Sequence, residues 1–151
     1  MSKKESVVFT NMCLIYKGDE ILVQERTKDD WPGLTFPGGH VKKDENFYDS
    51  IIREVKEETN LTILHPILCG IEEYKKTDNN DRYVILFYKC NEFVGELKSS
   101  NEGKVFWIKR KDLNQYKLSL DLDRILKVIE SNDLSELLYY LEDEEYKSKV
   151  I

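Results

Sequence analysis

Residues 38–61, GGHVKKDENFYDSIIREVKEETNL, constrain this chain most, because they place two glycines before a helix that carries three glutamates. The hydrophobic periodicity predicts that helix over residues 46–59. Glu54, Glu57 and Glu58 then stand at i, i+3 and i+4, so the three carboxylates share one helix face. Like charges at this spacing repel each other and weaken a purely structural helix. A divalent cation reverses that effect, since Mg²⁺ prefers carboxylate oxygens and keeps positions for water and phosphate.

Length and charge fit one domain, residues 1–151, that acts on small molecules. The chain has 151 residues, with 29 Asp and Glu against 23 Lys and Arg, which gives a net charge of −6. That charge disfavours non-specific binding to nucleic-acid polymers. The sequence shows neither a signal peptide nor an apolar run of about 18 residues, so no membrane span is expected. Three widely spaced cysteines among apolar residues indicate reduced thiols and a cytoplasmic location.

Residue patterns predict an α/β fold with a mixed central sheet and C-terminal helices. Strands are predicted at residues 6–16, 20–26, 35–37, 61–74, 81–90 and 105–108. Helical segments are predicted from residue 111, over 121–130 and over 133–141, and the charged end, 142–151, is expected to fray. In the central helix, Phe47, Ile51 and Val55 form the predicted buried stripe. One central helix plus C-terminal helices would cover the sheet on both faces.

The glycine and glutamate segment resembles the Nudix box, G-x5-E-x7-R-E-U-x-E-E-x-G-U, where U is a bulky aliphatic residue. The matching residues are Gly39, Glu45, Arg53, Glu54, Val55, Glu57, Glu58 and Leu61. Asn60 stands where the family has glycine, and asparagine is the next-best residue for a left-handed helix end. The stretches TNMCLIY, WPGLTFPGGHV, REVKEETNLTI and GELKSSNEG also resemble a bacterial MutT-like subgroup of 8-oxo-dGTP diphosphatases.

The resemblance implies a Nudix-type α/β/α sandwich that hydrolyses a nucleoside diphosphate linked to another group, with Mg²⁺ or Mn²⁺. The implied metal ligands are the Gly39 carbonyl, Glu54, Glu57 and Glu58. Arg53 would hold these glutamates in place through charge-assisted hydrogen bonds. Glu45 is the candidate partner of Arg53, and the alternative is a solvated glutamate that favours the helix dipole.

The implied catalytic residues are Glu54, Glu57, Arg53 and Glu102. In similar proteins the general base is a box glutamate or a glutamate on a later loop. Glu102, in the stretch SSNEG, resembles that later glutamate. The alternative is that it is an ordinary loop residue.

Three residues outside the box are candidates for substrate binding. Arg26 would bind phosphate, and the alternative is a surface arginine. Trp31 could stack on a nucleobase or anchor its loop, and Tyr83 could line the base pocket or fill the core. Asn11 and Asp121 are speculative candidates for reading the purine edge.

The preferred substrate is an oxidised purine nucleotide such as 8-oxo-dGTP, cleaved to the monophosphate and pyrophosphate. ADP-ribose, ordinary NTPs and RNA 5′ ends remain alternatives within the same chemistry. A non-catalytic nucleotide-binding module is a further alternative, but the box keeps all its glutamates. The expected partner is a small nucleotide, with no stable nucleic-acid polymer and no membrane, and the protein is expected to be a monomer or a homodimer.

Overall fold

The computed structural model describes residues 3–27, 32–76 and 78–151 of the chain. Its strands are β1 (Val7–Lys17), β2 (Glu20–Arg26), β3 (Gly33–Thr35), β4 (Gly38–His40), β5 (Thr62–Ile63), β6 (Ile67–Lys75), β7 (Arg82–Cys90), β8 (Phe93–Val94), β9 (Gly103–Lys109), β10 (Glu136–Glu142) and β11 (Glu145–Val150). Its helices are α1 (Phe47–Thr59), the 3₁₀ helix η1 (Arg110–Gln115) and α2 (Leu122–Glu130). None of the helices in these three ranges is long and apolar enough to cross a membrane.

A large mixed sheet runs in the order β11-β10-β6-β7-β1-β2-β3, and β4 and β9 join it at β1 and β2. Strand β1 pairs parallel with β7, then turns at Gly18 into its hairpin partner β2. The other edge of β1 pairs with β4, which is the glycine pair followed by His40. This pairing fixes the start of the box against the centre of the sheet.

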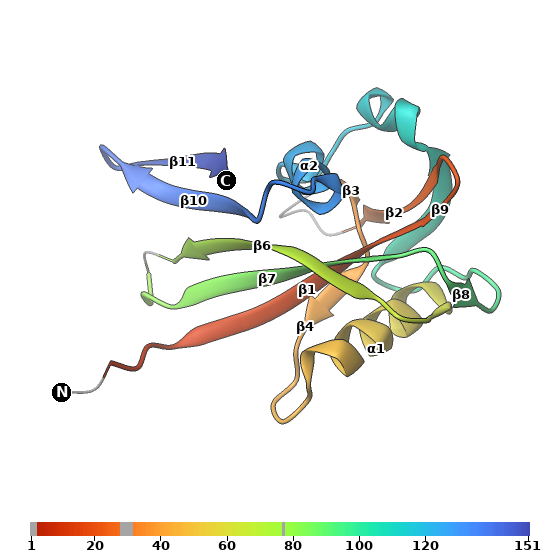
Figure 1. The fold of residues 1–151 in the computed structure, drawn as a ribbon, viewed down its shortest axis with the longest axis horizontal. Helices are drawn as coiled ribbons and strands as arrows, with labels where there is room; N and C mark the ends of the chain where they lie inside the picture. Colours follow the sequence, from red (N-terminus) through yellow and green to blue (C-terminus); the bar gives the residue numbers. More distant parts are fainter. Residues whose placement is uncertain (1–2, 28–31, 77) are drawn as a thin grey trace.

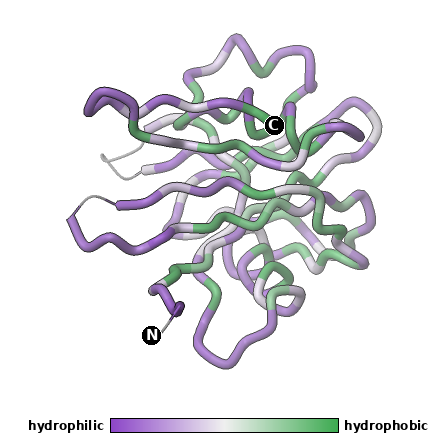
Figure 2. The backbone as a smooth tube through the Cα atoms, turned by 60° about the vertical axis from the view of Figure 1, so that its left-hand side comes forward, coloured by the Kyte–Doolittle hydropathy of each residue, from purple (hydrophilic) through white to green (hydrophobic). Residues whose placement is uncertain are grey.

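Helices α1 and α2 cover different faces of the sheet (Figure 1). Helix α1 contacts β1, β4, β5 and β9, whereas α2 contacts β6, β7 and β10. Each helix has its own buried cluster, with Ile51 and Val55 under α1 and Val128 and Ile129 under α2. Figure 2 shows hydrophobic residues where the strands cross and hydrophilic residues at the outer turns. The predicted sandwich with a mixed sheet is therefore confirmed.

Helix α1 begins and ends where the sequence predicts. The Asn46 side chain accepts a hydrogen bond from the Asp49 amide at 2.7 Å and caps the start. Asn60 ends the helix with φ 67°, the left-handed conformation expected for it. The predicted buried stripe of this helix is wrong at one position: Ile51 and Val55 are fully buried, but Phe47 is 40% exposed. Its ring instead packs on Phe9 of β1, with centroids 4.9 Å apart.

The predicted helix over 133–141 and the frayed end over 142–151 are wrong. These residues form the hairpin β10–β11, and β10 adds parallel to the edge of β6. Asp143 and Glu144 close the hairpin with φ 52° and 67°, the left-handed angles of a tight two-residue turn. The leucine spacing suits a helix equally well, but only a strand satisfies the open backbone groups of β6. The C-terminal part therefore contributes one α-helix, α2, and two strands.

The predicted strand over 61–74 is split into β5 and β6. His65 has φ 56° and Pro66 follows it, so the chain turns between the two strands. Strand β6 is itself irregular, because its register with β7 shifts between Leu68 and Gly70. The three cysteines are free thiols, as expected.

Candidate active site

Arg53 organises the acidic face of α1. Its Nε and Nη2 donate to both oxygens of Glu45 at 2.7 and 2.9 Å, a bidentate pair. Its Nη1 donates to Glu54 at 2.9 Å and to Glu57 at 3.2 Å. Its Nη2 also donates to the His40 carbonyl at 3.1 Å, at the end of β4. The expected pairing of Glu45 with Arg53 is confirmed, and one guanidinium joins the glycine strand to three carboxylates.

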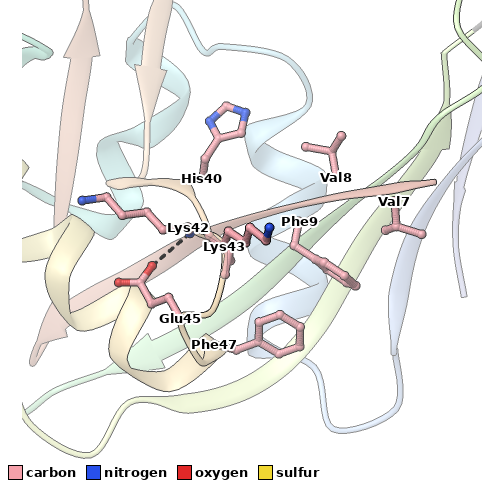
Figure 3. A pocket seen from close by; sticks show the side chains of 9 residues that line it. Val7, Val8, Phe9, His40, Lys42, Lys43, Glu45 and Phe47 are labelled. Atoms are coloured by element: carbon pink, nitrogen blue, oxygen red, sulfur yellow. Dashed lines mark hydrogen bonds between the residues drawn. The ribbon is translucent and has the colours of Figure 1, made fainter.

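These contacts keep Glu45 ionised well below neutral pH, because they lower its pKa. The hydrogen bond from Arg53 and the one from the Lys42 amide, at 3.0 Å, lower the pKa of Glu45 to about 2 (Figure 3). The same pairing raises the pKa of Arg53 above its usual range. The ion pair is therefore present across the physiological pH range.

The two glycines make close contacts, with backbone at Gly38 and with the Glu54 carboxylate at Gly39. A Cβ at Gly38 would lie 2.0 Å from the Asn11 carbonyl oxygen, and one at Gly39 would lie 2.4 Å from the Glu54 carboxyl carbon. The Gly39 amide donates to the Asn11 side chain at 3.0 Å, and the Asn11 amide donates to Ser50 at 3.0 Å. Asn11 is thus a buried residue whose side chain connects β1 to β4 and α1 through hydrogen bonds. These contacts do not support the speculative role in recognising the purine edge.

Glu58 is the buried member of the triplet, with 6% exposure. Its Oε2 accepts from the Gln24 side chain at 3.1 Å and from the Gly38 amide at 3.2 Å. Burial raises the pKa of Glu58 to about 7, and the negative charges of Glu54 and Glu102 raise it further. The hydrogen bonds from Gly38 and Gln24 act in the opposite direction and lower this pKa. Sequence reasoning missed Gln24, and the available signal was an amide two residues after Leu22, on the same face of β2.

Glu102 and Arg26 lie at the neighbouring ends of β9 and β2. Glu102 lies in the turn before β9, where its amide donates to Ser100 Oγ at 3.2 Å. The next residue, Gly103, pairs with Arg26 in the sheet. Arg26 follows Gln24 by two residues, so both side chains lie on one face of β2. Together with the influence of Glu102 on Glu58, this places both candidates beside the acidic face of α1.

Two other candidates lie elsewhere or outside the described ranges. Tyr83 stacks on Tyr74 with centroids 5.1 Å apart, and Tyr74 meets the edge of Tyr139. The Tyr139 hydroxyl donates to Asp121 at the start of α2, so this aromatic group belongs to the α2 face. Trp31 lies outside the described residues.

An open hollow of about 400 Å³ lies at the start of the box but is not the acidic site. Phe9 and Phe47 lie side by side in it (Figure 3). Its lining residues are Val7, Val8, Phe9, His40, Val41, Lys42, Lys43, Glu45 and Phe47. The glutamates of the triplet do not line it, so this hollow is separate from the acidic face of α1.

Comparison with known proteins agrees with this geometry. The NUDIX domain family model matches residues 9–129, which is most of the chain. The chain belongs to the Nudix family. The whole fold of this Nudix protein matches the crystal structure of a MutT protein from Bacillus halodurans, with a TM-score of 0.78 and 25% identity over 95% of this chain and 97% of that one.

Two curated proteins are also similar to it. An ADP-ribose pyrophosphatase of Methanocaldococcus jannaschii is 30% identical over 118 residues, which are 76% of this chain and 68% of that protein. The uncharacterised Nudix hydrolase YvcI of Bacillus subtilis is 27% identical over 99 residues, and the match covers 63% of this chain and 61% of YvcI.

The donor set of this Nudix protein suits a hard divalent cation. Carboxylates and a backbone carbonyl are the oxygen ligands that Mg²⁺ and Mn²⁺ take. Within the described ranges, no three His, Cys, Asp or Glu side chains are arranged so that they could hold a metal ion as they stand. Glu54 and Glu57 pair with Arg53, whose single positive charge is also shared with Glu45, and Glu58 is buried on the same helix face. A cation could draw these three carboxylates together without refolding α1.

Proposed function

We propose that this Nudix protein is a metal-dependent nucleotide pyrophosphohydrolase. One observation carries the proposal: Arg53 holds Glu45, Glu54 and Glu57 on the helix face that also buries Glu58. A purely structural helix gains little from such a cluster, because its carboxylates repel one another. A cluster held ready for a cation accounts for both the repulsion and the arginine that restrains it.

The cation would be held by Glu54, Glu57, Glu58 and the Gly39 carbonyl. When bound, it would neutralise phosphate oxygens and lower the pKa of a water molecule. Arg53 does not touch substrate in this scheme, since its donors are already engaged by the box. Its role is to fix the direction in which the carboxylates face.

Glu102 and Arg26 would act on the substrate itself. Glu102 would accept the proton of the attacking water as that water adds to phosphorus, which requires a carboxylate on a loop that reaches the site. Arg26 would bind a phosphate oxygen as the pyrophosphate group leaves. The support for both roles is their position at the paired ends of β9 and β2.

The proposed substrate is an oxidised purine nucleoside triphosphate such as 8-oxo-dGTP, which would give the monophosphate and pyrophosphate. The support is the similarity of the whole chain to a MutT protein. Tyr83, Tyr74 and Asp121 lie on the α2 face, so they are not assigned to a substrate held at the acidic face of α1. The second candidate is ADP-ribose, because the M. jannaschii relative is named an ADP-ribose pyrophosphatase.

A nucleotide panel with product analysis tests the proposal. The purified protein is incubated with 8-oxo-dGTP, dGTP and ADP-ribose, in Mg²⁺ and in EDTA, and the products are separated by anion exchange. The expected result is pyrophosphate and 8-oxo-dGMP in Mg²⁺ only, with Glu57→Gln inactive. AMP and ribose phosphate would instead identify ADP-ribose as the substrate. Cleavage in EDTA equal to that in Mg²⁺, or no cleavage of any nucleotide, would contradict the proposed activity.

A further inference from the structure

Gln24 is a buried polar residue that the proposed chemistry does not yet use. It lies on β2 with 4% exposure, after three buried apolar residues, Ile21, Leu22 and Val23. Burying an amide costs free energy unless it is hydrogen-bonded. Its side-chain Nε2 meets that need by donating to Glu58 at 3.1 Å.

The hydrogen bonds to Glu58 are unevenly distributed over its two oxygens. In the described part of the chain, Gln24 Nε2 and the Gly38 amide both donate to Oε2 of this carboxylate. One donor comes from β2 and the other from β4, so two strands of the sheet hold one oxygen. This arrangement fixes the rotation of the carboxylate and directs Oε1 away from those donors.

The chemical type of the donor also matters. Glu54 and Glu57 are restrained by a guanidinium, which carries a full positive charge. Glu58 is restrained by two neutral N–H groups, which orient a carboxylate without cancelling its charge. A neutral donor therefore preserves the negative potential that attracts a cation, whereas an arginine at position 24 would compete with the metal.

We propose that Gln24 is a positioning residue that holds Oε2 of Glu58, so that Oε1 of the same carboxylate is presented to the divalent cation. This inference rests on the proposed metal-dependent function and adds a residue outside the Nudix box. Partners that orient a ligating carboxylate typically contribute about 10- to 100-fold to metal affinity. The role predicts an effect on metal binding in the absence of any substrate.

The first test is Mn²⁺ affinity, measured by electron paramagnetic resonance of free Mn²⁺. Gln24→Met keeps side-chain length and volume but removes the donor. The matched control is Gln115→Met, because Gln115 also donates to a carboxylate, Asp112, at 3.4 Å, but on the surface. We expect about 10- to 100-fold weaker Mn²⁺ binding in Gln24→Met and less than twofold change in Gln115→Met. Far-UV circular dichroism in EDTA checks that both variants are folded.

The second test uses the unaltered protein and applies if Gln24→Met does not fold. The sequence contains two glutamines, Gln24 and Gln115, so ¹⁵N-glutamine labelling gives two side-chain amide pairs, assigned with Gln115→Met. Adding Mg²⁺ should shift the Gln24 pair and leave the Gln115 pair in place. A folded Gln24→Met that binds Mn²⁺ as tightly as the wild type, or an unmoved Gln24 pair on saturation, would overturn the inference. Failure of the wild type to bind Mn²⁺ would overturn the proposed function itself.

Discussion

Glu72 on β6 should make the stability of this protein fall as the pH rises. It lies on the α2 face of the sheet, opposite Ile85 on β7, and is 8% exposed. Burial raises the pKa of Glu72 from 4.5 to about 7, and the negative charge of Asp121 adds to the rise. The folded state therefore binds this proton more tightly than the unfolded state does.

The size of the effect follows from that difference in pKa. Between about pH 4.5 and pH 7 the folded state holds a proton that the unfolded state has released, so the free energy of unfolding decreases with pH. One pKa unit corresponds to about 1.4 kcal/mol, so the loss from this group between pH 5 and pH 8 is about 2–3 kcal/mol. Glu72→Gln removes this titration. The free energy of unfolding of the variant minus that of the wild type should therefore be about 2–3 kcal/mol larger at pH 8 than at pH 5.

Urea unfolding at pH 5 and pH 8 in EDTA measures this difference. Glu58 titrates in the wild type and in the variant alike, so its contribution cancels in the comparison. Glu142→Gln is the matched control, because Glu142 is exposed and pairs with Lys147 at 3.2 Å on the outer hairpin. The control should show no such pH-dependent gain. A stability difference between Glu72→Gln and wild type that is equal at both pH values would refute the reasoning.

Other substitutions test the box directly. Arg53→Lys should keep the fold but lower kcat by about 10- to 100-fold, since an ammonium cannot replace the bidentate contacts; unchanged kcat would contradict this. Gly39→Ala places a Cβ 2.4 Å from the Glu54 carboxyl carbon, so Mn²⁺ titration should show at least about tenfold weaker binding. Asn60→Gly should change the free energy of unfolding by less than about 0.5 kcal/mol, because glycine suits φ 67° but loses the hydrogen bond to the Glu96 carbonyl at 2.8 Å. If urea unfolding shows that the variant loses more than about 1 kcal/mol of stability, the hydrogen bond to Glu96 matters more than the backbone conformation at this position.

The helix of the box could be predicted in detail because its signals are local. Asn46 and Asn60 mark its ends, and the spacing of Ile51 and Val55 gives its buried face. The spacing also put three glutamates on one face, and the pairing of Arg53 with Glu45, eight residues earlier, followed from the family pattern.

The rest of the site depends on contacts between distant segments. Gln24 and Asn11 lie on β2 and β1, and only strand pairing brings them to Glu58 and Gly39. The C-terminal hairpin was missed for a similar reason, since its leucines fit a helix until the open edge of β6 is known. Nothing in residues 133–150 alone reveals that edge.

The central claim is that the glutamates of α1 form a binding site for a divalent cation. Mn²⁺ titration of the wild type and of Glu57→Gln, followed by electron paramagnetic resonance without nucleotide, tests it most directly. The account predicts saturable binding to the wild type, competition by Mg²⁺, and at least about tenfold weaker binding to the folded variant. Equal Mn²⁺ affinity in both proteins, or no saturable binding to the wild type, would contradict it.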